Sequence, residues 1–280
     1  MVRRNKKEYM RIAGDEPGFY MDEDITYSQA GAFFGIATRD LRMNVIYPKT
    51  EKRTYPCIIW ICGGGWSQMD KGVHTPYLAD LARRGFVVAS AEYRLAHEAS
   101  FPGALIDIKA AIRYLRAHAR RYSINTEKFG VMGESAGGYL TAMTAVTNSI
   151  EFEKGAYLDF SSGVQAACPW YMPCDIAGFI KNSGLRLPFF DGDMDGDEQY
   201  KRNINPANHI TNQAPPFLIL HGDADETVPL SEGEMFYEAL TAQGADARMI
   251  ILENEGHGGP QFVQRPLWDI IAGFFTEKLS

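Results

Sequence analysis

The segment "VMGESAGGYL" (131–140) carries the pattern G-x-S-x-G around Ser135. An apolar stretch before it, "KFGVMG" (128–133), predicts a strand, and "AGGYLTAMTAVT" (136–147) predicts a helix. The motif needs this strand–turn–helix context, because the tight turn lifts the serine hydroxyl clear of the end of the sheet. We therefore interpret Ser135 as a nucleophile. The alternative is a glycine-rich helix start that only packs closely.

A serine hydroxyl needs a base to take its proton and an acid to orient that base. His257 lies in "NEGHGG", a glycine-flanked loop after the last predicted strand, and is our candidate base. "HGDADETVP" follows another predicted strand and contains Asp225, our candidate acid. Asp223 is the alternative acid, unless it braces the turn. The chain order Ser135, Asp225, His257 is the one found with this serine motif.

Apolar stretches alternate with helical patterns along most of the chain. The predicted strands are 57–62, 86–93, 128–133, 163–170, 216–222 and 247–253, and the predicted helices are 76–85, 101–122, 136–147, 231–244 and 262–279. Continuous apolar strands separated by helices predict an α/β fold with a mostly parallel central sheet and helices on both faces. In such sheets the chemistry gathers at the carboxyl ends of the strands.

Two parts of the chain depart from this alternation. Residues 33–40 and 41–48 predict an antiparallel hairpin that joins the sheet, after an N-terminal arm of residues 1–30. Residues from about 171 to 214 are rich in Gly, Pro, Asn and Asp, and long irregular insertions of this kind are usually lids or binding loops. We expect one domain, 1–280, with an inserted lid.

Composition excludes several classes of function. The 280 residues carry a net charge of −7, which disfavours a nucleic-acid groove. We expect neither a signal peptide nor a membrane span, so the four cysteines should be reduced in a cytoplasmic protein. Their spacing does not indicate zinc, and we expect no metal and no cofactor. The oligomeric state stays open, with a homodimer as one alternative.

Several motifs together resemble one superfamily. "ICGGGW", "AEYRLAHEASFPGALIDIKAAIRYLR", "GESAGG", "HGDADETVP" and "EGHGG" resemble the α/β-hydrolase superfamily, most closely its esterase/lipase group. That group includes hormone-sensitive-lipase-like and bacterial feruloyl or acetyl esterases. The resemblance runs from about residue 33 to the C-terminus and is weakest in the insertion. It implies an α/β-hydrolase fold and hydrolysis of esters.

The resemblance also assigns an oxyanion hole. In that family a His-Gly-Gly-Gly loop supplies N–H donors, which here correspond to Gly64 and Gly65, joined by Ala136 at the start of the helix after Ser135. The family's histidine position holds Cys62, and we interpret it as a brace for the loop. A reactive thiol is the alternative, which requires a nearby cation or helix N-terminus.

The resemblance further suggests an ion pair between Arg94 and Asp107 beneath the site, against the alternative of two separate surface charges. The acidic stretch 191–202 imitates a calcium loop, but its twelfth position is Arg202 instead of glutamate. We interpret it as a solvated acidic loop whose carboxylates suit sugar hydroxyls.

Four residues near the serine and the strand ends are candidates for substrate binding: Trp66, Glu134, Trp170 and Tyr171. Aromatic rings there suit a sugar or a hydroxycinnamoyl group, and packing inside the lid is the alternative for Trp170 and Tyr171.

The hypothesis is a serine carboxylesterase that hydrolyses short-chain acyl or hydroxycinnamoyl esters, with acylated plant oligosaccharides as candidate substrates. An amide-cleaving relative, such as an arylformamidase or a small serine peptidase, would use the same three residues. A hydrolase fold that binds a ligand without turnover is the further alternative.

Overall fold

A computed structural model describes residues 7, 9–12, 14, 17–32, 36–49, 54–147, 152–184 and 187–280. Its strands are β1 (Gly18–Ala32), β2 (Ala37–Lys49), β3 (Tyr55–Ile61), β4 (Val87–Ala91), β5 (Ile124–Glu134), β6 (Ala166–Trp170), β7 (Phe217–Gly222) and β8 (Ala247–Leu252). They form one sheet in the order β1-β2-β4-β3-β5-β6-β7-β8. The strands from β3 to β8 are parallel, and β1 and β2 are antiparallel to their neighbours.

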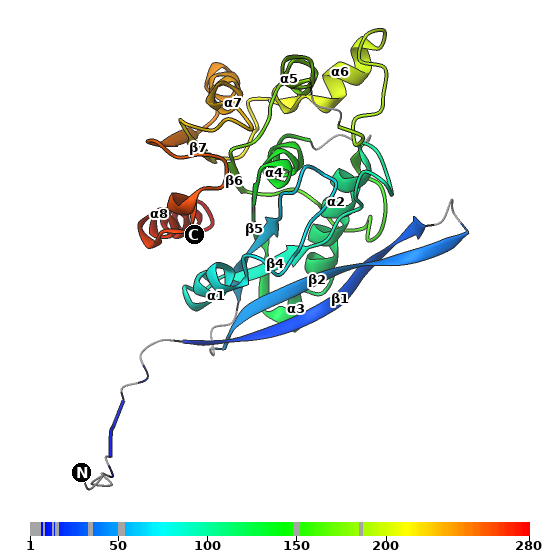
Figure 1. The fold of residues 1–280 in the computed structure, drawn as a ribbon. Coiled ribbons are helices and arrows are strands. Elements are labelled where there is room, and N and C mark those ends of the chain that lie inside the picture. The colour runs from blue at the N-terminus through cyan, green and yellow to red at the C-terminus, as the bar shows by residue number, and fades with distance from the viewer. Residues whose placement is uncertain are drawn as a thin grey trace, which may run out of the picture.

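Helices cover both faces of this sheet (Figure 1). They are α1 (Thr75–Arg83), α2 (Gly103–Ala117), α3 (Ala119–Tyr122), α4 (Ala136–Val146), α5 (Ile176–Ser183), α6 (Glu198–Ile204), α7 (Leu230–Ala242) and α8 (Arg265–Lys278), with 3₁₀ turns η3 (Pro206–His209) and η4 (Pro260–Val263). One apolar cluster joins the sheet to α2, α4 and α7, and a second joins its other face to α1 and α8. The predicted α/β class, with a mostly parallel sheet between helices, is confirmed.

The N-terminal hairpin differs from the prediction. Strand β1 pairs antiparallel with β2, from Gly18 opposite Lys49 to Ala32 opposite Ala37. Residues 41–48 lie in a strand, as predicted, but residues 37–40 belong to the same strand and not to its partner. The predicted pairing of 33–40 with 41–48 is therefore wrong, and so is the arm 1–30 over the residues that form β1; residues 33–35 lie outside the described part. Of the side chains of β1 whose burial is described, only Tyr27 and Ala30 are buried, so no apolar run marked this strand.

The insertion at 171–214 contains α5, α6 and η3, which lie beside α7 and α4 (Figure 1). Its residues 185 and 186 fall outside the described part. The insertion is tied to the helix that follows Ser135, because the Tyr139 hydroxyl donates to the Ile204 carbonyl at 2.7 Å. That this segment acts as a lid stays a prediction.

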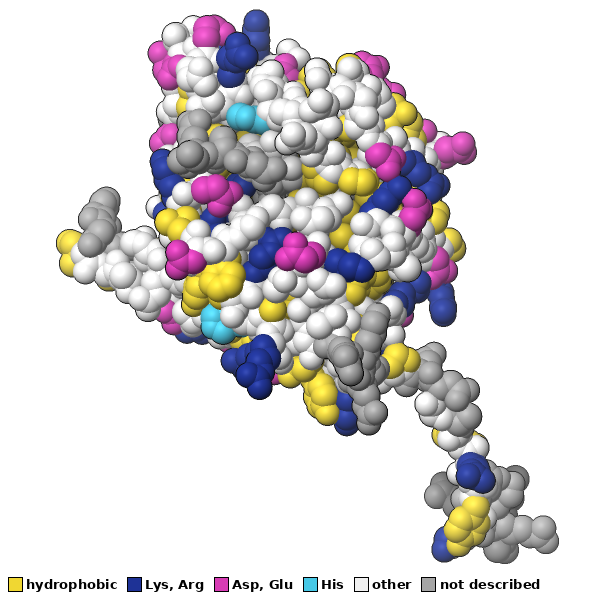
Figure 2. All heavy atoms as spheres, turned by 180° about the vertical axis from the view of Figure 1, so that it is seen from behind, with side chains coloured by type: hydrophobic (Ala, Val, Ile, Leu, Met, Phe, Trp, Pro, Cys, Tyr) yellow, Lys and Arg dark blue, Asp and Glu magenta, His cyan; other side chains and the backbone are white. Residues whose placement is uncertain are grey.

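Charged side chains are mixed on the face drawn in Figure 2, where the coloured Lys and Arg residues alternate with Asp and Glu. This mixture agrees with the small negative net charge and with the absence of a broad basic field among the coloured side chains of that face. Within the described residues, no helix has both the length and the apolar character needed to cross a membrane.

Candidate active site at the ends of β5, β7 and β8

Ser135 occupies a strained turn between β5 and α4. Its backbone has φ +53° and ψ −120°, a conformation that non-glycine residues rarely adopt. Two backbone hydrogen bonds hold the turn: the Ser135 N–H donates to the Trp170 carbonyl at 3.0 Å, and the Tyr139 N–H donates to the Ser135 carbonyl at 2.9 Å. The side chain is therefore presented at the carboxyl edge of the sheet, beside the free N–H groups of the first turn of α4.

The structure joins Ser135, His257 and Asp225 in one chain of hydrogen bonds. His257 Nε2 lies 2.9 Å from Ser135 Oγ, and His257 Nδ1 lies 2.7 Å from Asp225 Oδ2. The carboxylate can only accept, so Nδ1 carries the proton and Nε2 is left to accept from the serine hydroxyl. This arrangement prepares the imidazole to take the serine proton.

Backbone hydrogen bonds hold the Asp225 side chain in addition to its bond with His257. Its side chain is fully buried, and its Oδ1 accepts the backbone N–H groups of Thr227 and Val228, both at 2.9 Å. Burial acts to raise the pKa of Asp225, but the hydrogen bond from His257 and those backbone donors outweigh it and lower the pKa. The alternative acid, Asp223, instead accepts the Asn254 N–H at 2.6 Å and braces the turn.

The glycine loop after β3 lies against the serine turn. A Cβ added to Gly63 would come within 2.9 Å of the Glu134 carbonyl and 3.1 Å of Ser135 Cβ. Gly64 has φ +122°, and a Cβ there would meet the Gln68 carbonyl oxygen at 2.0 Å. Only glycine suits these positions. Among the hydrogen bonds of the described residues, none uses the N–H of Gly64 or Gly65 as a donor, so both are available to a ligand.

Cys62 lies at the start of this loop, and its carbonyl accepts the Tyr93 hydroxyl at 2.9 Å. Burial raises the pKa of its thiol to about 11, which argues against the alternative of a reactive thiolate. Beneath the loop, Arg94 Nη2 lies 2.9 Å from Asp107 Oδ1, and the Arg94 backbone N–H also donates to Asp107. The predicted ion pair is confirmed.

Tyr171 and Glu134 have contacts that the sequence did not reveal. The Tyr171 hydroxyl donates to Glu134 Oε2, and its ring lies against His257 with 4.6 Å between centroids. Burial, and then the neighbouring Glu134 carboxylate, raise the pKa of Tyr171, so the phenol stays protonated. In this structure both residues support the site from the side of His257.

Two residues predicted to bind substrate, Trp66 and Trp170, are buried. The Trp170 ring is fully buried between Trp60, Phe262 and Trp268, on the face covered by α1 and α8. The Trp66 ring is 2% exposed and stacks on Phe189. The prediction that these rings line a substrate pocket is wrong, because each fills a core cluster instead. Trp170 contributes its carbonyl to the site, where it accepts the Ser135 N–H.

Some carboxylates of the acidic stretch 191–202 accept hydrogen bonds from its own backbone. Asp193 Oδ1 accepts the N–H groups of Asp195 and Gly196, and Asp197 caps α6 by accepting the Tyr200 N–H. These are turn and helix-cap bonds, which account for part of the calcium-like spacing without an ion.

Sequence reasoning missed His74, the residue before α1. Its Nδ1 lies 3.7 Å from Glu134 Oε1, although 60 residues separate the two in the chain. No motif links them, and only the fold brings them together.

Comparison with known proteins agrees with this architecture. The family model BD-FAE matches residues 43–240. The probable carboxylic ester hydrolase LipM of Mycobacterium tuberculosis is 30% identical over 195 residues, which cover 67% of this chain and 45% of LipM. The chain spans about half the length of the curated relatives it matches.

Two solved structures extend over nearly the whole chain. A truncated carbohydrate esterase from gut microbiota superposes with a TM-score of 0.79 at 28% identity, covering 95% of this chain and 98% of its own. Esterase 2 of Thermogutta terrifontis, phosphorylated by paraoxon, superposes with a TM-score of 0.75 at 25% identity, covering 96% and 97%. The fold is that of the α/β-hydrolase esterases.

Proposed function

The chain belongs to the BD-FAE family, and we propose that it is a serine carboxylesterase in which Ser135 is the nucleophile. One observation carries the proposal: the His257 ring is hydrogen-bonded on one side to Ser135 Oγ, at 2.9 Å, and on the other to the Asp225 carboxylate, at 2.7 Å. The strained serine turn lies at the same edge of the sheet as the N–H groups of Gly64 and Gly65, which have no partner within the described part of the chain. Similarity to esterases supports the ester as the bond that is cleaved.

In the first half of the reaction, Ser135 Oγ bonds to the ester carbonyl carbon as its proton passes to His257 Nε2. The carbonyl oxygen becomes an oxyanion, which the N–H groups of Gly64, Gly65 and Ala136 stabilise. The carbon–oxygen bond to the alcohol then breaks, and His257 returns the proton to the leaving oxygen. Asp225 holds the imidazole and stabilises its positive charge throughout.

In the second half, a water molecule takes the alcohol's place. His257 removes a proton from the water as its oxygen bonds to the acyl carbon. The intermediate collapses by breaking the bond to Ser135 Oγ, which recovers its proton from His257, and the carboxylic acid leaves. Every proton transferred in this cycle passes between Ser135, His257, the leaving alcohol and the water molecule.

We propose acylated oligosaccharides, with acetyl or hydroxycinnamoyl groups, as the substrate class. The similarity to a carbohydrate esterase supports this choice. A cavity of about 660 Å³ within the insertion is lined by Asp191 and Asp195 and by apolar Leu187 and Phe190. Phe190 packs edge-on against Trp66, the residue after the glycine loop, at 4.9 Å between centroids. Carboxylates beside apolar surface suit sugar hydroxyls and ring faces.

The test is hydrolysis of p-nitrophenyl acetate by the wild type, Ser135→Ala and Ser231→Ala. Ser231 is an exposed serine of α7 and serves as the matched control. We expect Ser135→Ala to lose at least about 10³-fold in kcat while Ser231→Ala matches the wild type. Equal rates in the wild type and Ser135→Ala would refute the proposal. A panel of acetylated and feruloylated oligosaccharides then tests the substrate class.

A further inference from the structure

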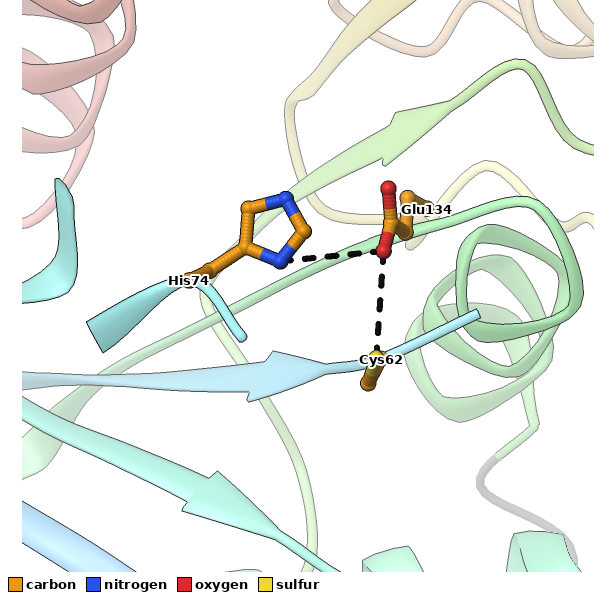
Figure 3. A group of neighbouring side chains, drawn as sticks. All are labelled: Cys62, His74 and Glu134. Atoms are coloured by element: carbon orange, nitrogen blue, oxygen red, sulfur yellow. Dashed lines mark hydrogen bonds and ion pairs between the residues drawn. The ribbon is translucent and has the colours of Figure 1, made fainter. Parts of the chain in front are cut away.

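Three potential metal ligands lie side by side (Figure 3). Cys62 follows β3, His74 precedes α1, and Glu134 ends β5. Oε1 of Glu134 lies 3.8 Å from Cys62 Sγ and 3.7 Å from His74 Nδ1, and the three ligand atoms lie within 4.8 Å of one another. A thiol, an imidazole and a carboxylate therefore converge on one point from three separate elements.

We propose that Cys62, His74 and Glu134 bind one Zn²⁺ ion. Zinc prefers thiolate, imidazole and carboxylate ligands, with bonds of about 2.3, 2.0 and 2.0–2.2 Å in a tetrahedral arrangement. Those bonds place neighbouring ligand atoms roughly 3.3–3.7 Å apart. The distances of 3.8 and 3.7 Å from Glu134 Oε1 lie close to this range, and the Cys62 and His74 ligand atoms lie within 4.8 Å of each other.

An unpaired nitrogen points to the ion. His74 is 9% exposed, and its Nδ1 is buried without a hydrogen-bond partner among the described residues. Buried polar atoms normally have a hydrogen-bond partner or a ligand, and this nitrogen has no hydrogen-bond partner within the described part of the chain. Glu134 Oε1 does not serve, because 3.7 Å is too long for a hydrogen bond. Glu134 Oε1 already accepts the Cys62 thiol at 3.8 Å, and a cation in the cluster would give Nδ1 the partner that it lacks.

The surroundings hold the ligands in place. The second oxygen of Glu134 accepts the Tyr171 hydroxyl, which orients the carboxylate and leaves Oε1 facing the cluster. The ring of His74 lies on Trp60, with 4.5 Å between centroids. Outer contacts of this kind fix ligand orientation at metal sites.

The site has a route for the ion and an open coordination position. The Glu134 side chain is 17% exposed, so an ion can enter past it. Three protein ligands leave one tetrahedral position for water. As the zinc–sulfur bond forms, the Cys62 thiol releases its proton to solvent, so uptake of the ion should be favoured as pH rises. The inference is independent of the proposed ester hydrolysis.

The first experiment adds CoCl₂ to chelator-treated wild-type protein. Co²⁺ bound to a thiolate gives a sulfur-to-metal charge-transfer absorption, which needs no variant to interpret. We expect one Co²⁺ per chain with this absorption, and its loss when ZnCl₂ is added. No bound Co²⁺, or bound Co²⁺ without the thiolate absorption, would overturn the proposal.

The second experiment compares Zn²⁺ affinity in Cys62→Ala and His74→Gln with two matched controls, Cys57→Ala and His97→Gln. Cys57 is a buried cysteine of β3 outside the cluster, and His97 is exposed. We expect each ligand variant to weaken Zn²⁺ binding by at least about 10-fold and the controls to keep wild-type affinity. Equal affinity in all variants would place the ion elsewhere and overturn the assignment.

Thermal unfolding gives a further readout. At roughly 100 times the Kd, Zn²⁺ should raise the wild-type Tm by roughly 5 °C. The same addition should raise the Tm of Cys62→Ala by no more than about half as much, because at a 10-fold weaker site the same Zn²⁺ concentration is only about 10 times the Kd. An equal rise in Cys62→Ala would contradict the site.

Discussion

The Tyr171 ring lies against the His257 imidazole, with 4.6 Å between ring centroids and 66° between ring planes. Tyr171 adopts φ +33°, a conformation that non-glycine residues rarely take, and its hydroxyl is tied to Glu134. The Tyr171 side chain thus connects Glu134, the residue before Ser135, with the His257 ring. We infer that Tyr171 positions His257 for proton transfer.

Removing the ring should therefore harm activity more than removing the hydroxyl. We expect Tyr171→Phe to lose less than about 10-fold in kcat/KM, and Tyr171→Leu roughly 100-fold, because small misplacements of a catalytic group are costly. Steady-state kinetics with p-nitrophenyl acetate measure both. Equal losses in the two variants would show that the hydroxyl, and not the ring, carries the effect.

The two aspartates after β7 should respond differently to the same substitution. Asp225→Asn removes the acceptor that fixes the His257 tautomer and should lower kcat by roughly 10³–10⁴-fold. Asp223→Asn is the matched control, since Asp223 only accepts the Asn254 N–H, and should cost less than about 10-fold. If the losses were reversed, Asp223 would be the acid.

The glycine loop allows a graded comparison. Gly64→Ala would push a Cβ to 2.0 Å from the Gln68 carbonyl and displace the donor, so we expect kcat to fall about 10²–10³-fold. Gly65→Ala meets nothing within 4 Å and keeps its N–H, so it should cost much less, mainly through its φ of +60°. Unfolding midpoints separate loop damage from loss of folding. Similar kcat values for Gly64→Ala and wild type would contradict the oxyanion assignment.

Glu153 neutralises two buried cations. Lys109 and Arg113 have fully buried side chains, and Lys109 Nζ lies 2.8 Å from Glu153 Oε1. Glu153→Gln leaves both charges without their anion, and we expect it to lower the free energy of unfolding by about 3 kcal/mol at neutral pH. The exposed Glu238→Gln serves as control and should change it by less than about 0.5 kcal/mol.

The effect of Glu153 should depend on pH. Burial acts to raise its pKa, but Lys109, Ser162 and Arg113 outweigh burial and lower it from 4.5. Its charge therefore contributes fully above the unfolded pKa, and the contribution is lost as pH falls through the lowered folded pKa. In urea titrations, the gap between wild type and Glu153→Gln should stay constant above pH 4.5 and shrink below it. A gap that persisted at low pH would show that the ion pair is not its source.

Local motifs predicted much of the fold and the site. The G-x-S-x-G turn, "HGDADETVP" and "NEGHGG" each follow an apolar strand, so the parallel sheet alone brings Ser135, Asp225 and His257 to one edge. Strand β1 escaped prediction because most of its described side chains are not buried and its sequence is partly acidic. Hydrophobic periodicity cannot reveal a strand in which so few side chains are buried.

Other features depend on tertiary contacts that no spacing encodes. Trp66 follows β3 and Trp170 is the last residue of β6, positions typical of pocket residues, yet their rings pack into core clusters on opposite sides of the sheet. His74, at the start of α1, meets Cys62 and Glu134 only in the folded chain. Which way a side chain turns at a strand end is decided by packing.

Covalent labelling tests the central claim most directly. A fluorophosphonate probe bonds to an activated serine and can be located by peptide mass spectrometry. The account predicts one label per chain, on the peptide that contains Ser135, and none on Ser135→Ala, while Ser231→Ala labels like the wild type. An unlabelled wild type, or a label on any other residue, would contradict the assignment of Ser135 as the nucleophile.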